Sequence, residues 1–176
     1  MKQILALCLL SLASPGLAQT PAWRAPQAEV AVFEADAATA FDAAQWKSRA
    51  GWTAVTEAPH SVRGGCIIGN LNFALAILPD AESIRVAGFD GEALWVEACR
   101  ISPNDESFPG RISEIRLRSL SPKSEARVWV TWTAGEESRT LDLTIPPDSP
   151  SLALRAGPGA REALVTASAE HLVAHD

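Results

Sequence analysis

The stretch IRLRSLSPKSEARVWVTW (residues 115–132) alternates apolar and polar residues, and so does RTLDLTIPP (residues 139–147) just after it. Such period-two alternation is typical of β-strands that bury one face and expose the other. Turn signals at Ser121-Pro122 and at Gly135 divide the region into strands, which we predict over residues 111–120, 125–133 and 138–145. The pattern predicts a mostly β, antiparallel domain.

Turn signals along the rest of the chain extend this pattern in both directions. Asp90-Gly91 is a typical hairpin turn. Strands at this spacing favour an antiparallel β-sandwich or jelly roll. Further β segments are predicted over residues 29–34, 66–78, 82–89, 92–101 and 152–155.

Two segments do not follow the β pattern. Residues 36–50 are rich in helix formers and predict one short helix near the N-terminus. Residues 161–175 fit a helix or a closing strand equally well, so the C-terminal segment stays open between the two.

The first 18 residues have the features of a secretory signal peptide. Lys2 precedes an apolar run over residues 4–12, and Gly16 and Ala18 occupy the −3 and −1 positions of a cleavage site. The run is too short to span a bilayer. With a composition rich in Ala and Arg, these features predict a periplasmic or secreted bacterial protein, cleaved after Ala18, with no membrane span afterwards.

Cleavage would leave an extended leader at residues 19–28 and a single β-sandwich domain at residues 29–176. It would also remove one of three cysteines and leave Cys66 and Cys99. An even pair of cysteines in an oxidising compartment predicts one disulfide between them.

The chain carries a formal net charge of −6 at pH 7, and the predicted signal peptide contributes a lysine but no acidic residue. An acidic protein is a poor partner for nucleic acid or for an anionic membrane surface. The six tryptophans, with no tyrosine, are compatible with a core, an interface or a sugar-stacking platform.

Strand alternation assigns side chains to the two faces of the predicted sheet. Ile115, Val128 and Leu141 belong to the inner set. Trp95 joins the outer set if its strand turns Leu94 inward, but the opposite parity fits equally well. The outer face then carries arginine, carboxylate and tryptophan side chains, at Arg116, Arg118, Arg127, Trp129 and Asp142.

Such a face is chemically suited to sugars. Planar guanidinium groups donate paired hydrogen bonds to hydroxyls, and the apolar side of a pyranose stacks on an indole. The alternative is an ordinary solvated sheet face with cross-strand ion pairs and an indole covered by arginine side chains. Both interpretations fit the residues.

The order of elements resembles the galactose-binding-like jelly rolls, which include many carbohydrate-binding modules. The resemblance rests on VFEADA (residues 32–37), on Gly64-Gly65, and on the two stretches quoted at the start. It spans roughly residues 30–155. It implies a glycan ligand and a structural calcium ion held by Glu34 and Asp36 in an acidic first strand.

No catalytic constellation emerges from the sequence. There is no G-x-S-x-G nucleophile elbow and no C-x-x-C pair. We therefore expect an exported, non-enzymatic binding or accessory module of the bacterial envelope, with a glycan bound on the outer sheet face. The alternative is a structural or protein-interaction subunit of an envelope complex, and an enzyme ranks third.

Overall fold

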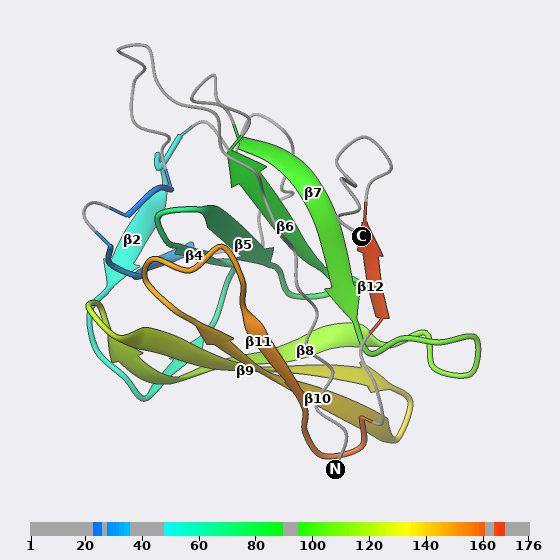
Figure 1. Ribbon diagram of the computed structural model, residues 1–176. Helices are drawn as coiled ribbons and strands as arrows, with labels where there is room; N and C mark the ends of the chain where they lie inside the picture. The colour runs from blue at the N-terminus through cyan, green and yellow to red at the C-terminus, as the bar shows by residue number, and fades with distance from the viewer. Residues whose placement is uncertain (1–22, 26–27, 36–47, 90–94, 161–163, 168–176) are drawn as a thin grey trace.

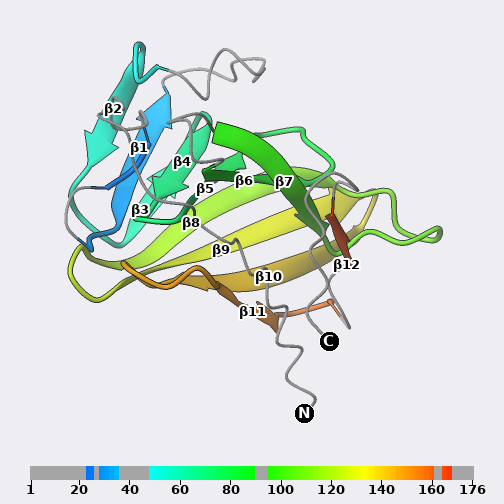
Figure 2. The same cartoon turned by 45° about the horizontal axis from the view of Figure 1, so that its top comes forward.

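The computed structural model describes residues 23–25, 28–35, 48–89, 95–160 and 164–167, and these form two antiparallel β-sheets (Figure 1). One sheet has seven strands in the order β12-β7-β6-β5-β4-β1-β2, and the other has five in the order β11-β10-β9-β8-β3. The sheets lie one above the other, and β8 to β11 run side by side in Figure 2.

The strands of the seven-stranded sheet are short, with bounds β1 Ala31–Ala35, β2 Trp52–Val55, β4 Cys66–Gly69, β5 Phe73–Ile77, β6 Ile84–Phe89, β7 Trp95–Ser102 and β12 Leu164–Ala167. The five-stranded sheet contains the longest strands, with bounds β3 His60–Val62, β8 Arg111–Ser121, β9 Glu125–Ala134, β10 Glu137–Ile145 and β11 Ala153–Ala156. The three strands predicted from the quoted stretches are therefore confirmed, with ends within a residue of the prediction.

The core lies between the sheets and draws side chains from both of them. Ile68 and Val86 from the seven-stranded sheet pack in one buried cluster with Val128 and Leu143 from the five-stranded sheet. Trp132 is fully buried there, and its indole N–H donates to the carbonyl oxygen of Glu82 at 3.0 Å. Because one core joins both sheets, the antiparallel two-layer architecture predicted from the alternation is confirmed.

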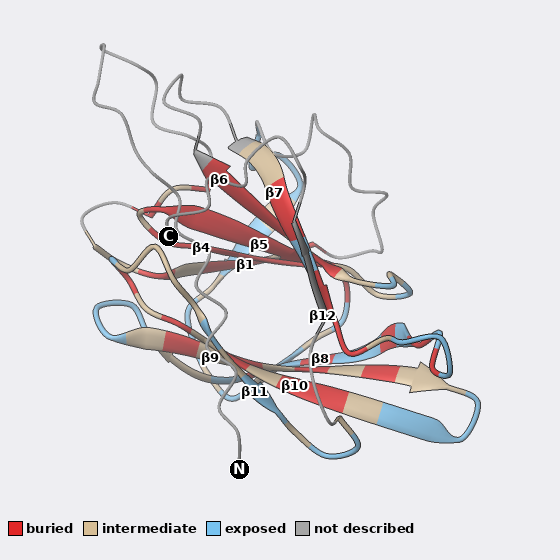
Figure 3. Cartoon of the chain, turned by 45° about the vertical axis from the view of Figure 1, so that its right-hand side comes forward, coloured by how far each residue is buried: buried red, intermediate tan, exposed pale blue. Residues whose placement is uncertain are grey.

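Burial differs between the two sheets, as Figure 3 shows. Buried and half-buried residues alternate along β9, whereas β4 and β5 are buried along their whole length. The seven-stranded sheet therefore has a second apolar layer on its outer side, containing Trp23, Phe33 and Ile67. The outer face of the five-stranded sheet carries mainly polar side chains.

Trp23 is the largest buried side chain of this second layer. Its side chain is fully buried and meets Phe33 edge to face, with ring centroids 5.3 Å apart. The main chain at Trp23 runs so close to Gly69 that a side chain at Gly69 would collide with it. Trp23, which lies in the predicted leader, is thus packed inside the fold.

Asn70 links the turn between β4 and β5 to the segment after β10. This fully buried amide donates to the carbonyl oxygens of Pro146 and Ser149 at 2.8 and 3.1 Å. Its Oδ1 accepts the main-chain N–H groups of Asn72 and Phe73. All of these bonds are made in the interior, where an unpaired polar group would be costly.

The predicted disulfide between Cys66 and Cys99 is wrong. Both residues are buried and no disulfide joins them. Cys66 lies on β4 and Cys99 on β7, and β5 and β6 separate these strands. Three strand spacings amount to about 14 Å, whereas a disulfide requires Cα atoms less than about 7 Å apart.

A β-bulge decides which way β7 faces. Val86 pairs with Cys99 and Ala87 with Glu97, so Ala98 is the extra residue. Cys99 consequently joins the core between the sheets, while the register puts Glu97 on the outer face of the seven-stranded sheet beside Arg85. Neither strict alternation considered for this strand applies along its whole length.

Other predictions are tested in part. The helix predicted over residues 36–50 lies outside the described residues except for 48–50, which are not helical. Within the C-terminal segment, residues 164–167 form a strand. Most neighbouring strands are consecutive in the chain, and the exceptions are β1 beside β4, β7 beside β12 and β3 beside β8. The finer jelly-roll assignment, which requires two Greek keys, is not confirmed. Among the described residues, no helix has the length and hydropathy needed to cross a membrane.

Candidate functional site

Five of the six residues predicted to bind a ligand lie on the outer face of the five-stranded sheet. One cross-strand row runs over all five strands, because Ser61 pairs with Arg116, Arg116 with Trp129, Trp129 with Asp142 and Asp142 with Arg155. Trp129 is half-buried in the middle of this row, whereas Arg116 and Arg155 are exposed. We call this surface, with Arg118 and Arg127 beside the row, the arginine face.

Arg118 covers the indole at the centre of the arginine face. Its guanidinium carbon lies 3.9 Å from the centroid of the Trp129 ring. Arg118 is the extra residue of a bulge between Leu117 and Ser119, which brings it diagonally over Trp129. The contact is a cation–π interaction, and it restricts the plane of the guanidinium group.

Arg127 and Asp142 form an ion pair next to the indole. Nη2 of Arg127 donates to Oδ2 of Asp142 at 2.7 Å, across the β9–β10 ladder. Nε of Arg127 and Oδ1 of Asp142 are buried without a hydrogen-bond partner. The pair therefore retains one donor and one acceptor for which the described residues provide no match.

The remaining arginines on this face carry uncompensated charge. Among the residues that the structure describes, no carboxylate forms an ion pair with Arg116, Arg118 or Arg155. Glu114 and Glu125 lie on the same face toward the ends of β8 and β9. The centre of the arginine face is therefore positive, in a chain whose net charge is −6.

Trp95, the sixth predicted residue, does not belong to the arginine face. It lies at the start of β7 in the seven-stranded sheet, where it pairs with Phe89. Alternation along a strand shows which residues share a face, but it does not show which sheet the strand joins. The sequence therefore could not show that Trp95 lies in the other sheet.

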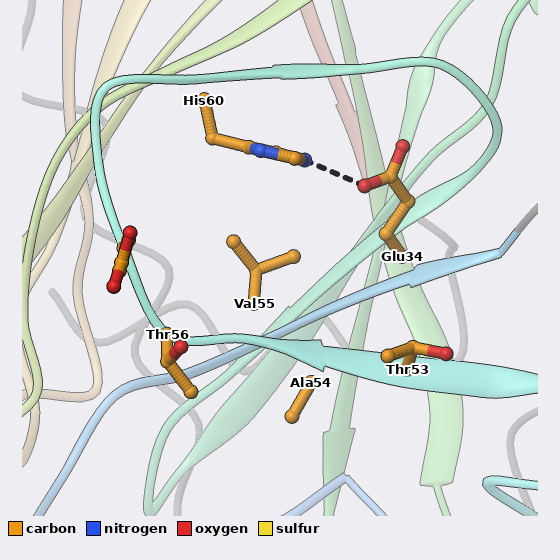
Figure 4. A pocket seen from close by; sticks show the side chains of 7 residues that line it. Glu34, Thr53, Ala54, Val55, Thr56 and His60 are labelled. Carbon is orange, nitrogen blue, oxygen red and sulfur yellow. Dashed lines mark hydrogen bonds and ion pairs between the residues drawn. The ribbon is translucent and has the colours of Figure 1, made fainter.

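A second polar site lies where β2 leaves the seven-stranded sheet and β3 enters the other. Figure 4 shows the residues that line a pocket of about 310 Å³ there, with Glu34 and His60 facing one another. Oε2 of Glu34 lies 2.6 Å from Nε2 of His60, and Oε1 accepts the main-chain N–H of Arg63 at 2.6 Å. Since Glu34 is on β1 and His60 on β3, this contact joins the two sheets.

The charge state of Glu34 follows from these contacts. Burial alone would raise the pKa of its carboxyl, but the hydrogen bonds from Arg63, His60 and Gly64 and the attraction of His60 outweigh burial and lower it. An ionised carboxylate can only accept, so Nε2 of His60 is the donor in this contact. Burial raises the pKa of the Cys66 thiol, and the negative charge of Glu34 raises it further.

The pocket has part of the apparatus of an acid–base site. A carboxylate that orients an imidazole is the base half of many hydrolytic sites. Among the described residues, however, the pocket is lined besides Glu34 and His60 only by Thr53, Ala54, Val55, Thr56 and Glu57. This set includes two threonine hydroxyls but no serine or cysteine, and the contact between Glu34 and His60 joins β1 to β3.

The calcium prediction concerns the same carboxylate. Both oxygens of Glu34 already accept hydrogen bonds, one of them from a histidine, and Asp36 lies outside the described residues. Within the described part of the chain, no group of three His, Cys, Asp or Glu residues could hold a metal ion. Calcium binding stays a prediction.

Comparisons with protein-family models, with curated proteins and with solved structures found no match to this chain. Function is therefore inferred from the two sites themselves. The sequence did not reveal two features of these sites. Arg155 was missed because its short edge strand has little alternation. The contact of His60 with Glu34 was missed because β3 is only three residues long.

Proposed function

We propose that this protein is a non-enzymatic binding module of the bacterial envelope that binds a glycan on the arginine face. The observation that carries the proposal is the central position of Trp129, beneath Arg118 and in register between Arg116 and Asp142. An indole surrounded by planar donors and a carboxylate suits a ligand with an apolar ring face and many hydroxyls.

The contacts within the arginine face explain how a sugar would bind there. Arg118 covers Trp129, so a sugar ring either stacks on the guanidinium plane or displaces it and stacks on the indole. Arg127 Nε and Asp142 Oδ1 are buried and have no partner within the described protein, so sugar hydroxyls pair with them only when binding moves the side chains that cover them. Regaining these hydrogen bonds adds affinity, because unpaired buried polar atoms are costly.

The location of the protein and its resemblance to a known family are also part of the proposal. The signal peptide directs the chain to the periplasm or the exterior, and the resemblance to galactose-binding-like, jelly-roll carbohydrate-binding modules agrees with a glycan ligand. The alternative is a subunit of an envelope complex that contacts a partner protein through the same face. That alternative predicts no response to any glycan.

Tryptophan fluorescence tests the proposal. Titration of the mature protein with a panel of soluble polysaccharides should shift or quench its emission for at least one of them. In Trp129→Ala, affinity for that polysaccharide should fall about tenfold, the equivalent of losing one stacking contact of roughly 1.4 kcal/mol. Trp52→Phe, which removes an indole from the other sheet, should retain the response. A panel without any response contradicts the proposal.

A further inference from the structure

The arginine face concentrates positive charge in an acidic protein. Arg116, Arg118, Arg127 and Arg155 lie on it. Asp142 pairs with Arg127, and Glu114 and Glu125 lie on the same face toward the ends of β8 and β9. Charges on the rest of the molecule act weakly here, because salt at about 0.1 M screens exposed charges beyond roughly 10 Å. An approaching ligand therefore meets the local guanidinium groups and not the average charge of the chain.

The spacing of these arginines excludes a small anion as the best-fitting ligand. Arg116 on β8 and Arg155 on β11 stand in one row, with β9 and β10 between them. Three strand spacings put their Cα atoms about 14 Å apart. Trp129 and Asp142 occupy the positions between them. A ligand that contacts both ends is elongated and carries more than one anionic group.

The chemistry of the centre separates a sugar polymer from other polyanions. Guanidinium groups bind carboxylates in paired, planar hydrogen bonds, and Arg118, which lies over Trp129, supplies one such group at the centre of the face. Between the positive ends, the indole and Asp142 require a ligand with an apolar ring face and hydroxyl groups. A polypeptide of acidic residues or a lipid headgroup does not combine these features in one repeating chain.

We propose that the ligand of the arginine face is a polysaccharide rich in uronic acids, whose carboxylates pair with Arg116 and Arg155 while a sugar ring covers the Arg118–Trp129 stack. This inference rests on the proposed glycan-binding function and specifies the class of glycan. Charge decides the specificity, so the neutral form of the same polymer binds weakly.

Calorimetric titration with chemically matched polymers tests the inference. The mature protein is titrated with polygalacturonate and with polymannuronate, each beside its fully methyl-esterified form, in a buffer that contains a chelator. Esterification removes the negative charge and keeps the sugar backbone. The free acids should bind about tenfold more tightly than the esters, and added salt should weaken only their binding.

A pair of double variants assigns the effect to this surface. Arg116→Gln with Arg155→Gln removes two exposed, unpaired charges and should weaken binding of the free acids about tenfold. Its unfolding temperature should match that of the wild type. Arg85→Gln with Arg100→Gln removes the same charge from the other sheet and should leave binding unchanged.

Each other outcome has a definite meaning. Equal affinity for acid and ester, or binding only to neutral polysaccharides of the wider panel, overturns the inference and leaves the proposed glycan function standing. No binding to any polysaccharide overturns both. Equal or tighter binding to polyglutamate or to phosphatidylserine vesicles also overturns the inference, because it shows that charge alone, without a sugar, suffices.

Discussion

The guanidinium carbon of Arg118 lies 3.9 Å from the centre of the Trp129 ring, so an outward-facing indole of the five-stranded sheet is packed beneath a positive charge. This contact fits both interpretations of the outer face, as a sugar-binding surface and as a solvated face with a covered indole. It is a cross-strand stack that protects an aromatic side chain, and it also supplies a guanidinium group at the centre of the face. Experiments on this pair therefore bear on stability and on binding separately.

Arg118→Ala should uncover the indole. We expect acrylamide to quench the emission of Trp129 more strongly in this variant, measured as the difference from the same variant in a Trp129→Phe background. The free energy of unfolding should fall by about 0.5–1 kcal/mol, the usual size of an exposed cation–π contact. Arg155→Ala, on the same face but with β10 between it and β9, should change neither quantity.

Glu34→Gln should remove the pH dependence that the Glu34 carboxylate gives to the stability of the contact between the two sheets. The pKa of Glu34 is lowered from 4.5 in the folded protein, so its ionised form contributes stability above pH 4.5. That contribution disappears as the pH falls through the lower folded value. We expect the variant to be less stable by about 1–3 kcal/mol near pH 7, the usual cost of losing bonds to a charged group.

Urea unfolding at a series of pH values measures this difference. The difference in the free energy of unfolding between wild type and Glu34→Gln should become smaller as the pH falls below 4.5. Glu57→Gln is the matched control, because Glu57 lines the same pocket and is exposed. A difference that stays constant down to acid pH would show that the Glu34 carboxylate is not what ties the sheets together.

Asn70→Ala should be among the more damaging polar substitutions in the chain. It removes two donated and two accepted hydrogen bonds in the interior and leaves buried main-chain groups unpaired. We expect a loss of about 3 kcal/mol in the free energy of unfolding. Ser151→Ala, nearby but only half-buried, should cost about 0.5 kcal/mol or less. A small effect of Asn70→Ala would mean that solvent reaches this site.

Cys66 and Cys99 should behave as thiols in the purified mature protein. In denaturant without reductant, a maleimide reagent should label both, and reduction should change neither the mass nor the unfolding temperature. In the native state labelling should be slow, because both residues are buried and burial raises the pKa of the Cys66 thiol. A gain of two hydrogens on reduction would instead show a disulfide and a different arrangement of β4 to β7.

The sequence predicted β8, β9 and β10 well because one face of their sheet is buried and the other is solvated. Alternation is clearest along β9, where it correctly separated Val128 and Val130 from Arg127 and Trp129. β2 and β3 were missed for the opposite reason. They are short, most of their residues are exposed or half-buried, and they are held by pairing with β1 and β8.

Relations between distant strands could not be predicted in the same way. The disulfide prediction rested on the even number of cysteines and on the compartment, but sheet order is a property of the whole chain and puts two strands between Cys66 and Cys99. The bulge at Ala98 had no turn residue to mark it. Nothing in the sequence around His60 indicates that Glu34 lies 2.6 Å away.

The most direct test of the central claim maps the ligand onto the molecule. Backbone amide and indole N–H chemical shifts are followed by nuclear magnetic resonance while oligogalacturonate is added to the mature protein. The account predicts the largest changes at the Trp129 indole N–H and at the amides of Arg116, Asp142 and Arg155. Changes centred instead on His60 and Thr53, or on the outer side of the seven-stranded sheet, would contradict it.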